Sequence, residues 1–264
     1  MKLRKYLYLA LLFFSLTSCE DVLEIDLNEA DARVVIEAQL NDLSTSQQIR
    51  ISQTVPFAAA VKSKAITDAQ VIVTDNQGRT YAFRHQDDGM YSQVNFLPVA
   101  GRTYKLEVRV GEALYEANCT MPAYVAVDSV GVIKEKIFKD DYYFATFKFN
   151  DPAEQENYYK YDLAIEKGAL KFAAVFNDKF NDGRYVTHQI GDRDEDIFPG
   201  DSLTVRRYCV DKAVYKFWNE FQMTNPGSAA PANPSSNISN HALGYFSVAS
   251  AKEYVLLVTD IETD

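Results

Sequence analysis

The residue best placed for covalent chemistry is Cys19, one of three cysteines in the 264-residue chain. It follows Leu16-Thr17-Ser18 and an apolar run, Tyr6 to Phe14, which comes directly after a positively charged amino terminus. A basic start, a short apolar core and small residues before a cut site are the parts of a secretory signal. The sequence therefore predicts a signal peptide over residues 1–18, cleaved between Ser18 and Cys19.

The stretch that ends at Cys19 resembles the bacterial lipobox, in which the cysteine thiol takes a diacylglycerol and the new amino group is acylated. A nucleophilic sulfur accepts the lipid, and each buried methylene adds ~0.8 kcal/mol of membrane affinity. The apolar run has about half of the ~20 residues that a membrane-spanning helix needs. We therefore expect lipid attachment at Cys19 and no permanent span. The alternative is an ordinary signal peptide with a cysteine there by chance.

The charge of the mature chain limits its partners. The whole chain has 27 basic and 37 acidic side chains, and residues 1–18 hold three of the basic ones and no acid, which leaves a net charge near −13. This argues against nucleic acid and against adhesion to an anionic membrane surface, since both favour basic patches. We expect a domain held to the outer membrane by its lipid, after an acidic tether over residues 19–32.

The acids after the anchor carry a second signal. Glu20, Asp21, Glu24 and Asp26 resemble the export signal that takes lipoproteins of Bacteroidota to the outer face of the outer membrane. This similarity predicts display at the cell surface. The alternative is a plain acidic tether with no address function, which leaves the periplasmic face open.

Catalytic motifs are missing from the sequence. The three histidines show no zinc spacing, and neither a glycine-rich phosphate loop nor a GxSxG elbow occurs. We expect His85, His188 and His241 at surface or loop positions, and we expect neither an enzyme nor a cofactor. A Ser–His–Asp set assembled in space is the alternative.

Two acidic loops are candidates for calcium binding. Residues 192–201 offer Asp192, Asp194 and Asp196 at alternate positions, but Leu203 stands where a calcium loop has its bidentate glutamate. Residues 177–183 offer Asn177, Asp178, Asn181 and Asp182. Solvated acidic turns explain both loops equally well, so the sequence assigns no metal ligand.

Two other modifications are open in the mature chain. Cys119 and Cys209 can form a disulfide in an exported protein, which would join two β units, or remain small buried apolar side chains. We favour the unpaired state. Ser129 and Ser202 each lie in an Asp-Ser-aliphatic triplet, which resembles the acceptor of protein O-glycosylation in Bacteroidota but is short enough to occur by chance.

Short β-like runs dominate residues 33–122. Along "TYKLEVRV", Tyr104, Leu106, Val108 and Val110 alternate with polar residues, which is the period of two of a half-buried strand. Six further segments read as strands: "RVVIEAQL", "QQIRISQT", "AQVIVTD", "TYAFRH", "MYSQVNF" and "ALYEANCT". Residues 33–122 therefore predict a seven-stranded antiparallel β-sandwich of immunoglobulin or transthyretin type.

Residues 123–264 predict a second β-rich unit with one short helix. Six strands precede the helix, which begins after an N-cap at Asp211 and buries Val214, Phe217, Trp218 and Phe221. Asn225-Pro226-Gly227 ends it and opens a loop over residues 225–240. "LGYFSVAS" and "EYVLLVTD" are expected to close the chain as a hairpin.

Several stretches together resemble a known family. "VVIEAQL", "ITDAQVIVTD", "AGRTYKLEV", "ANCTMP" and above all "NPSSNISNHALGYFSVAS" are similar to lipoproteins of Bacteroidota grouped as domain of unknown function 4249. Members are typically encoded beside TonB-dependent outer-membrane receptors. The resemblance therefore implies an accessory role at such a receptor, with binding or gating of an unidentified substrate. It implies no catalytic residues.

The alternative is an independent surface module for adhesion or glycan binding, because a sandwich fold hosts many functions. Exposed rings at Tyr245 and Phe246 would favour sugar stacking, although we expect both to pack in the core. An apolar face near residues 225–240 would favour the receptor accessory.

Overall fold

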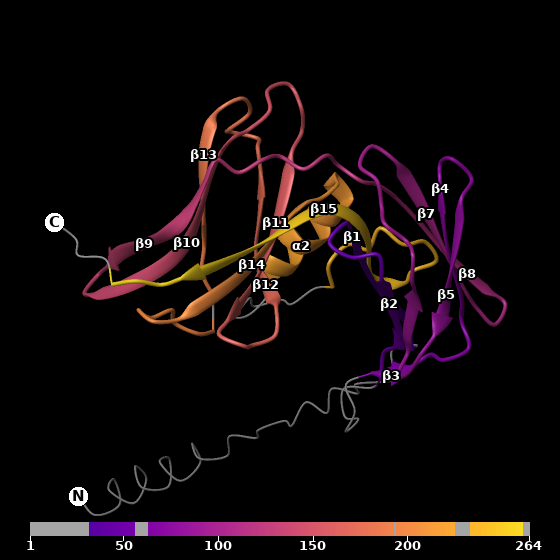
Figure 1. Ribbon diagram of the computed structural model, residues 1–264. Helices are drawn as coiled ribbons and strands as arrows, with labels where there is room; N and C mark the ends of the chain where they lie inside the picture. Colours follow the sequence, from indigo (N-terminus) through magenta and orange to yellow (C-terminus); the bar gives the residue numbers. More distant parts are fainter. Residues whose placement is uncertain (1–31, 56–62, 193, 225–232, 261–264) are drawn as a thin grey trace, which may run out of the picture.

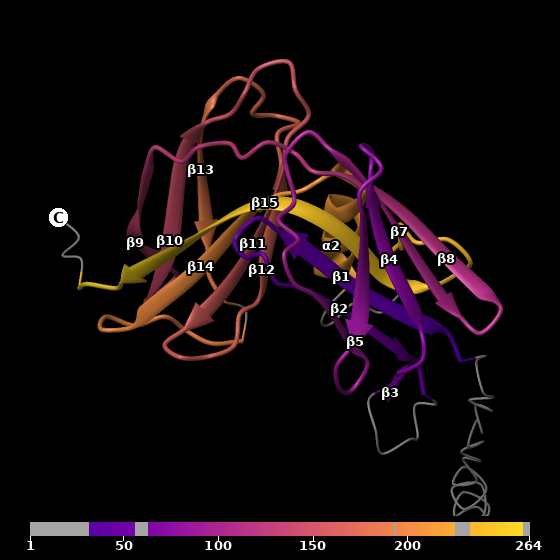
Figure 2. The ribbon, with the colours of Figure 1, turned by 45° about the vertical axis from the view of Figure 1, so that its right-hand side comes forward.

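The computed structural model describes residues 32–55, 63–192, 194–224 and 233–260 (Figure 1). Within these ranges the chain forms fifteen strands and one helix, so the predicted mainly-β class is confirmed. Two β-rich units lie side by side, and helix α2 lies between them in both views (Figures 1 and 2).

The first unit contains all seven strands predicted over residues 33–122 and one more. The eighth is the two-residue β3, which pairs with β2. The strands are β1 (Val34–Asn41), β2 (Gln47–Gln53), β3 (Lys64–Ala65), β4 (Gln70–Asp75), β5 (Thr80–His85), β6 (Met90–Gln93), β7 (Thr103–Val110) and β8 (Ala113–Thr120). Their hydrogen-bonded order is β1-β2-β6-β5-β4-β7-β8. Tyr104, Leu106 and Val108 of β7 point into the core, as the alternation predicts.

The second unit consists of two sheets and the helix. It comprises β9 (Ser129–Ile137), β10 (Asp140–Asn150), β11 (Tyr158–Ile165), β12 (Lys171–Asn177), β13 (Tyr185–Ile190), β14 (Ser202–Cys209), α2 (Lys212–Thr224) and β15 (Leu243–Leu257). A three-stranded sheet, β13-β10-β9, lies opposite β12-β11-β14-β15 (Figure 2). Helix α2 begins at the predicted cap, because the Asp211 carboxylate accepts the Val214 N–H at 2.9 Å.

Strand β15 belongs to both units. Its first part pairs in parallel with β1, from Val35 opposite Leu243 to Asn41 opposite Ala249. Its second part pairs antiparallel with β14, from Ser250 to Leu257. The predicted hairpin is therefore wrong, and the first sandwich is not purely antiparallel. The residues at the changeover, Ser250-Ala251-Lys252, include no glycine, proline or asparagine, so nothing turns the chain back.

Residues 237–239 close the first unit between β8 and β15. The Asn237 side chain accepts the Phe246 N–H at 2.9 Å and donates to the Phe246 carbonyl at 2.8 Å, as a neighbouring strand would. The Ser239 N–H donates to the Glu116 carbonyl at 2.8 Å, and the Ser239 hydroxyl accepts the Glu116 N–H. The backbone groups of Phe246 and Glu116 at the two sheet edges are satisfied in this way.

Gly244 makes the parallel pairing possible. Its φ is +88°, and a Cβ at this position would lie 2.0 Å from the Ile36 carbonyl oxygen. Gly78 has a similar φ of +81° but open space around it. A substitution at Gly78 therefore tests backbone strain alone, whereas one at Gly244 tests backbone strain together with a steric clash.

We expect Gly78→Ala to lower the free energy of unfolding by about 1–2 kcal/mol, the cost of a left-handed alanine. Gly244→Ala should lower it by a further ~1–3 kcal/mol, because the methyl group has no room beside β1. Urea unfolding of both variants measures the difference. Equal losses would contradict the view that close contact at Gly244 constrains the β1–β15 pair.

Candidate binding groove

The predicted lipid site lies outside the described residues. This holds for Ser18, Cys19, the signal over residues 1–18 and the tether up to residue 31. Lipid attachment and the cleavage site therefore stay predictions. Among the residues that are described, no helix has the length and the apolar composition needed to span a membrane.

Both remaining cysteines are free and buried. The Cys119 sulfur accepts the Val248 N–H at 3.2 Å, and the Cys209 sulfur accepts the Val125 N–H at 3.4 Å. Burial raises the pKa of both thiols, so they stay protonated near neutral pH. Cys119 and Cys209 are therefore unpaired, as the sequence analysis favoured, and each packs as a small buried side chain.

The two serine candidates begin strands. Ser129 opens β9 and is exposed, whereas Ser202 opens β14 and is half-buried. The backbone N–H of Ser202, and not its hydroxyl, donates to the Glu166 carboxylate at 2.9 Å. O-glycosylation at either serine stays a prediction.

One of the three histidines departs from expectation. His85 and His241 are exposed, but His188 on β13 is 4% exposed, so its predicted surface position is wrong. The alternation of Val186, His188 and Ile190 along the strand was the signal that places it inside. Its Nδ1 lies 2.9 Å from the Tyr161 hydroxyl, and its ring stacks on Phe176.

Burial and the charge of a fully buried arginine together explain why His188 is neutral. Arg207 on β14 donates from Nε to the Tyr161 hydroxyl and from Nη1 to the Val125 carbonyl. Aromatic rings of Phe149 and Tyr159 lie 4.5 and 4.6 Å from its guanidinium carbon. Burial, followed by the charge of Arg207, lowers the pKa of His188 to about 3. The imidazole is therefore neutral near pH 7, and this cluster ties the segment around Val125 to the second core.

A groove of about 350 Å³ lies where α2 meets β1 and β15. Its lining includes four aromatic rings: the Trp218 ring lies 5.2 Å from Tyr245 and 5.4 Å from Phe221, and Phe217 lies 4.9 Å from Tyr245. The remaining lining residues are Val35, Glu37, Asn233, Pro234, Leu243 and Gly244. The groove is thus beside the described end of the 225–240 loop, of which residues 225–232 lie outside the described residues.

A buried ion pair lies behind the groove. Lys160 and Asp162 of β11 are paired, and the Lys160 ammonium also lies 4.7 Å from the Trp218 ring and 4.8 Å from the Tyr208 ring. Burial lowers the pKa of Lys160, and the charge of Asp162 opposes this shift. The Tyr245 hydroxyl donates to Gln39, whose amide approaches Asp162. These contacts fix the orientation of two of the rings that line the groove, Trp218 and Tyr245.

The groove offers the apolar faces of its aromatic rings. The indole N–H of Trp218 is itself buried and has no hydrogen-bond partner among the described residues. Phe246 is fully buried, which confirms the expected core packing, whereas Tyr245 is half-buried and lines the groove. Such a surface can hold an apolar segment of a partner or the face of a sugar ring. The sequence predicted the rings of α2 but not the groove that they line together with β1, because that groove depends on the path of β15.

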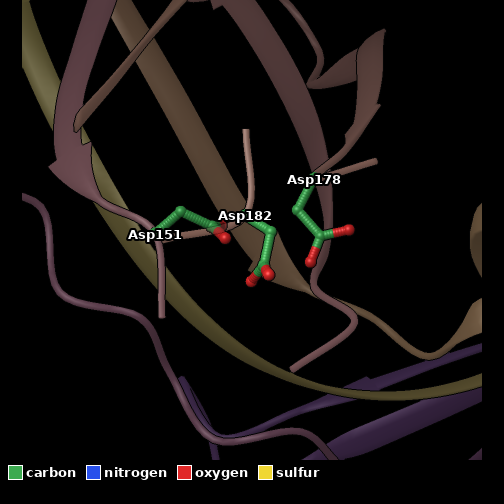
Figure 3. Close-up of side chains that lie close together, drawn as sticks. All are labelled: Asp151, Asp178 and Asp182. Atoms are coloured by element: carbon green, nitrogen blue, oxygen red, sulfur yellow. The ribbon is translucent and has the colours of Figure 1, made fainter. Parts of the chain in front are cut away.

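The two acidic loops differ. In the loop over residues 192–201, the Asp192 carboxylate accepts the N–H groups of Asp194 and Glu195, as in an ordinary turn. In the loop over residues 177–183, Asp178 and Asp182 approach Asp151, which the sequence pattern did not include (Figure 3).

Comparison with known proteins gives a family but no activity. The family model described as "Domain of unknown function (DUF4249)" matches residues 20–254. No curated protein matches the chain. Among solved structures, a two-domain fibronectin type III segment of chicken tenascin is similar at 14% identity and a TM-score of 0.21. That alignment covers 68% of this chain and 89% of the tenascin segment.

The buried His188 predicts loss of stability in acid. Its folded pKa of about 3 lies below the ordinary 6.5, so below pH 6.5 the unfolded chain binds a proton that the folded chain does not. The contribution of His188 to the free energy of unfolding is fully present above pH 6.5 and is lost as the pH drops toward 3.

Between pH 7 and pH 5, we expect the free energy of unfolding of the wild type to fall by about 2 kcal/mol more than that of His188→Gln. Urea unfolding at the two pH values measures it. His85→Gln, at an exposed position, should behave like the wild type. If His188→Gln lost as much stability as the wild type between these pH values, the buried His188 would not be the cause of the loss in acid.

Proposed function

The chain belongs to the family described as a domain of unknown function, DUF4249, and from this premise we propose a role. The protein is a lipid-anchored lipoprotein of the outer membrane. It acts as an accessory of a TonB-dependent receptor, where it binds or gates an unidentified substrate. The role at a receptor rests on the family resemblance, and the binding site is the aromatic groove between α2, β1 and β15.

The main support for a lipid anchor is the position of Cys19 in the sequence. This cysteine ends an apolar export signal, and the family match begins at the next residue, residue 20. A chain whose first 18 residues are removed would begin with the lipidated cysteine and continue directly into the family region. The acids over residues 20–26 then separate the lipid from the first described residues.

The groove supports a binding role because it combines apolar area with fixed geometry. Trp218 and Tyr245 are half-buried, and buried contacts hold both rings in place. Rigid aromatic side chains of this kind contribute most of the affinity at protein interfaces. A groove at the meeting of two units is also a common position for a ligand site.

The second candidate is an independent surface module for adhesion or glycan binding. The same groove favours it through the Trp218 and Tyr245 rings, whose centroids lie 5.2 Å apart. Aromatic faces of this kind suit the apolar face of a sugar ring. The two candidates therefore share a site and differ in its occupant.

The anchor predicts that Cys19→Ser abolishes labelling by a fatty-acid analogue in growing cells. The thiol is the acceptor of the diacylglycerol, so the hydroxyl variant should also leave the membrane fraction. Ser15→Ala changes the signal but keeps the cysteine, and it should be labelled normally. Continued labelling and membrane recovery of Cys19→Ser would overturn the anchor.

The accessory role predicts that a TonB-dependent receptor is recovered in a one-to-one ratio when the tagged protein is isolated from native outer membranes in mild detergent. Trp218→Ala should reduce the recovered receptor about tenfold or more, as loss of a central aromatic contact does. Met223→Ala changes an exposed side chain on the same helix outside the groove, so recovery should be unchanged. Mass spectrometry of the isolated complexes measures the ratio.

Recovery of the protein alone, in detergent that preserves a known receptor complex, would overturn the accessory role. A glycan array with the same three proteins then tests the second candidate. Glycan binding that Trp218→Ala loses and Met223→Ala keeps would support an independent module.

A further inference from the structure

Three aspartates converge at one end of the second unit. Asp151 follows β10, Asp178 follows β12, and Asp182 lies in the turn before β13 (Figure 3). Strand pairing brings them together, since the Asp151 N–H donates to the Arg184 carbonyl at 2.9 Å. One carboxylate oxygen from each aspartate lies within 4.8 Å of the others.

No cation in the described part of the chain neutralises this cluster. None of its three carboxylates forms an ion pair with a lysine, arginine or histidine of that part. Asp151 is only 4% exposed. Burial raises the pKa of Asp151, the hydrogen bond from Tyr159 opposes this, and the charges of Asp178 and Asp182 raise it further.

A buried oxygen in the cluster has no partner. Tyr159 donates its hydroxyl proton to Oδ1 of Asp151, and the Gly183 N–H approaches the same carboxylate and lowers its pKa. Oδ2 of Asp151 is nevertheless buried and has no partner at normal hydrogen-bond geometry among the described residues. An unsatisfied buried carboxylate oxygen is expensive, so such an atom points to a bound ion or water.

The neighbouring carboxylates are held in place on one side only. Asp178 accepts the Asn157 N–H through Oδ2 at 2.7 Å, and Asp182 accepts the Glu154 N–H through Oδ1 at 2.9 Å. The other oxygen of each makes none of these backbone contacts. The loop over residues 151–157 therefore orients both aspartates while leaving each an oxygen for a ligand.

We propose that Asp151, Asp178 and Asp182 bind a calcium ion. Calcium takes oxygen ligands at about 2.3–2.6 Å, so oxygens on opposite sides of it lie about 4.6–5.2 Å apart. Oxygens within 4.8 Å of one another fit one such sphere. Magnesium holds its ligands at about 2.0–2.1 Å in a strict octahedron and keeps several waters, so it fits this set less well.

The donor set favours hard cations over softer metals. All three side chains offer carboxylate oxygen, and neither imidazole nor thiolate belongs to the cluster. Carboxylates favour calcium, magnesium or manganese over zinc and copper. Water and backbone carbonyls supply the remaining ligands that calcium requires, and the affinity should be that of extracellular modules, about 10⁻⁴–10⁻³ M.

The ion would join two connections of the second unit. One is the loop over residues 151–157, which leads from one sheet to the other, and the second is the turn over residues 178–184. Glu156 of the first connection pairs with Lys212 at the start of α2. Calcium would thus stabilise the region where the helix that lines the groove begins. This inference does not depend on the proposed function.

The test is calcium titration of the purified full chain after treatment with a chelator. Calorimetry should show one calcium ion per chain, and calcium should raise the unfolding temperature by about 2–4 °C or more relative to chelator. Asp151→Asn should lose both effects. In chelator, Asp151→Asn should unfold at or above the wild-type temperature, because it removes a repelling charge, and a merely structural aspartate would not give that result.

Two further variants complete the test. Asp192→Asn changes the other acidic loop and should keep the calcium effect. Asp182→Asn is at an exposed ligand and replaces Asp151→Asn if that variant does not fold. The proposal is overturned if calcium up to about 10 mM, well above the expected dissociation constant, gives neither binding heat nor a temperature shift. It is also overturned if the ligand variants respond like the wild type.

Discussion

The pairing of β1 with the first part of β15 is the constraint on which the rest of the molecule depends. Without it, β1 would be an open edge, and the core around Ile36 and Leu40 would lack Phe246 and Val248. The same strand then completes the second unit beside β14. A single strand therefore fixes the two units relative to each other, and the position of α2 follows because the helix packs on β15 and β12.

The groove is a consequence of this arrangement and of a buried charge. Lys160 lies on the outer face of β11, where α2 covers it, and a buried ammonium needs a counter-charge and close contacts. Asp162 supplies the charge, and the rings of Trp218 and Tyr208 supply the contacts. A pair of this kind contributes little net stability, but it restricts how Trp218 can be placed. The wall of the groove is therefore set before any ligand arrives.

Features determined by near neighbours in the chain were predictable from the sequence. The alternation along β7 and the cap of α2 at Asp211 depend on contacts within a few residues, and the strand segments follow the same logic. The path of β15 depends instead on partners about 200 residues away. Apolar runs separated by Ser250-Ala251-Lys252 look the same whether they fold back or continue. Likewise, Asp151 lies far in sequence from Asp178, so no known spacing of ligands could have predicted their cluster. The groove could not be predicted either, because its lining residues come from segments far apart in the sequence.

The shared strand also determines when the protein can fold. Arg33, next to β1, donates to the carbonyl of His241, a contact between residues 208 positions apart. A nascent chain lacks this closing segment until β15 has been synthesised, so its first sandwich stays incomplete until then. Contacts of such high sequence separation make folding slow and late.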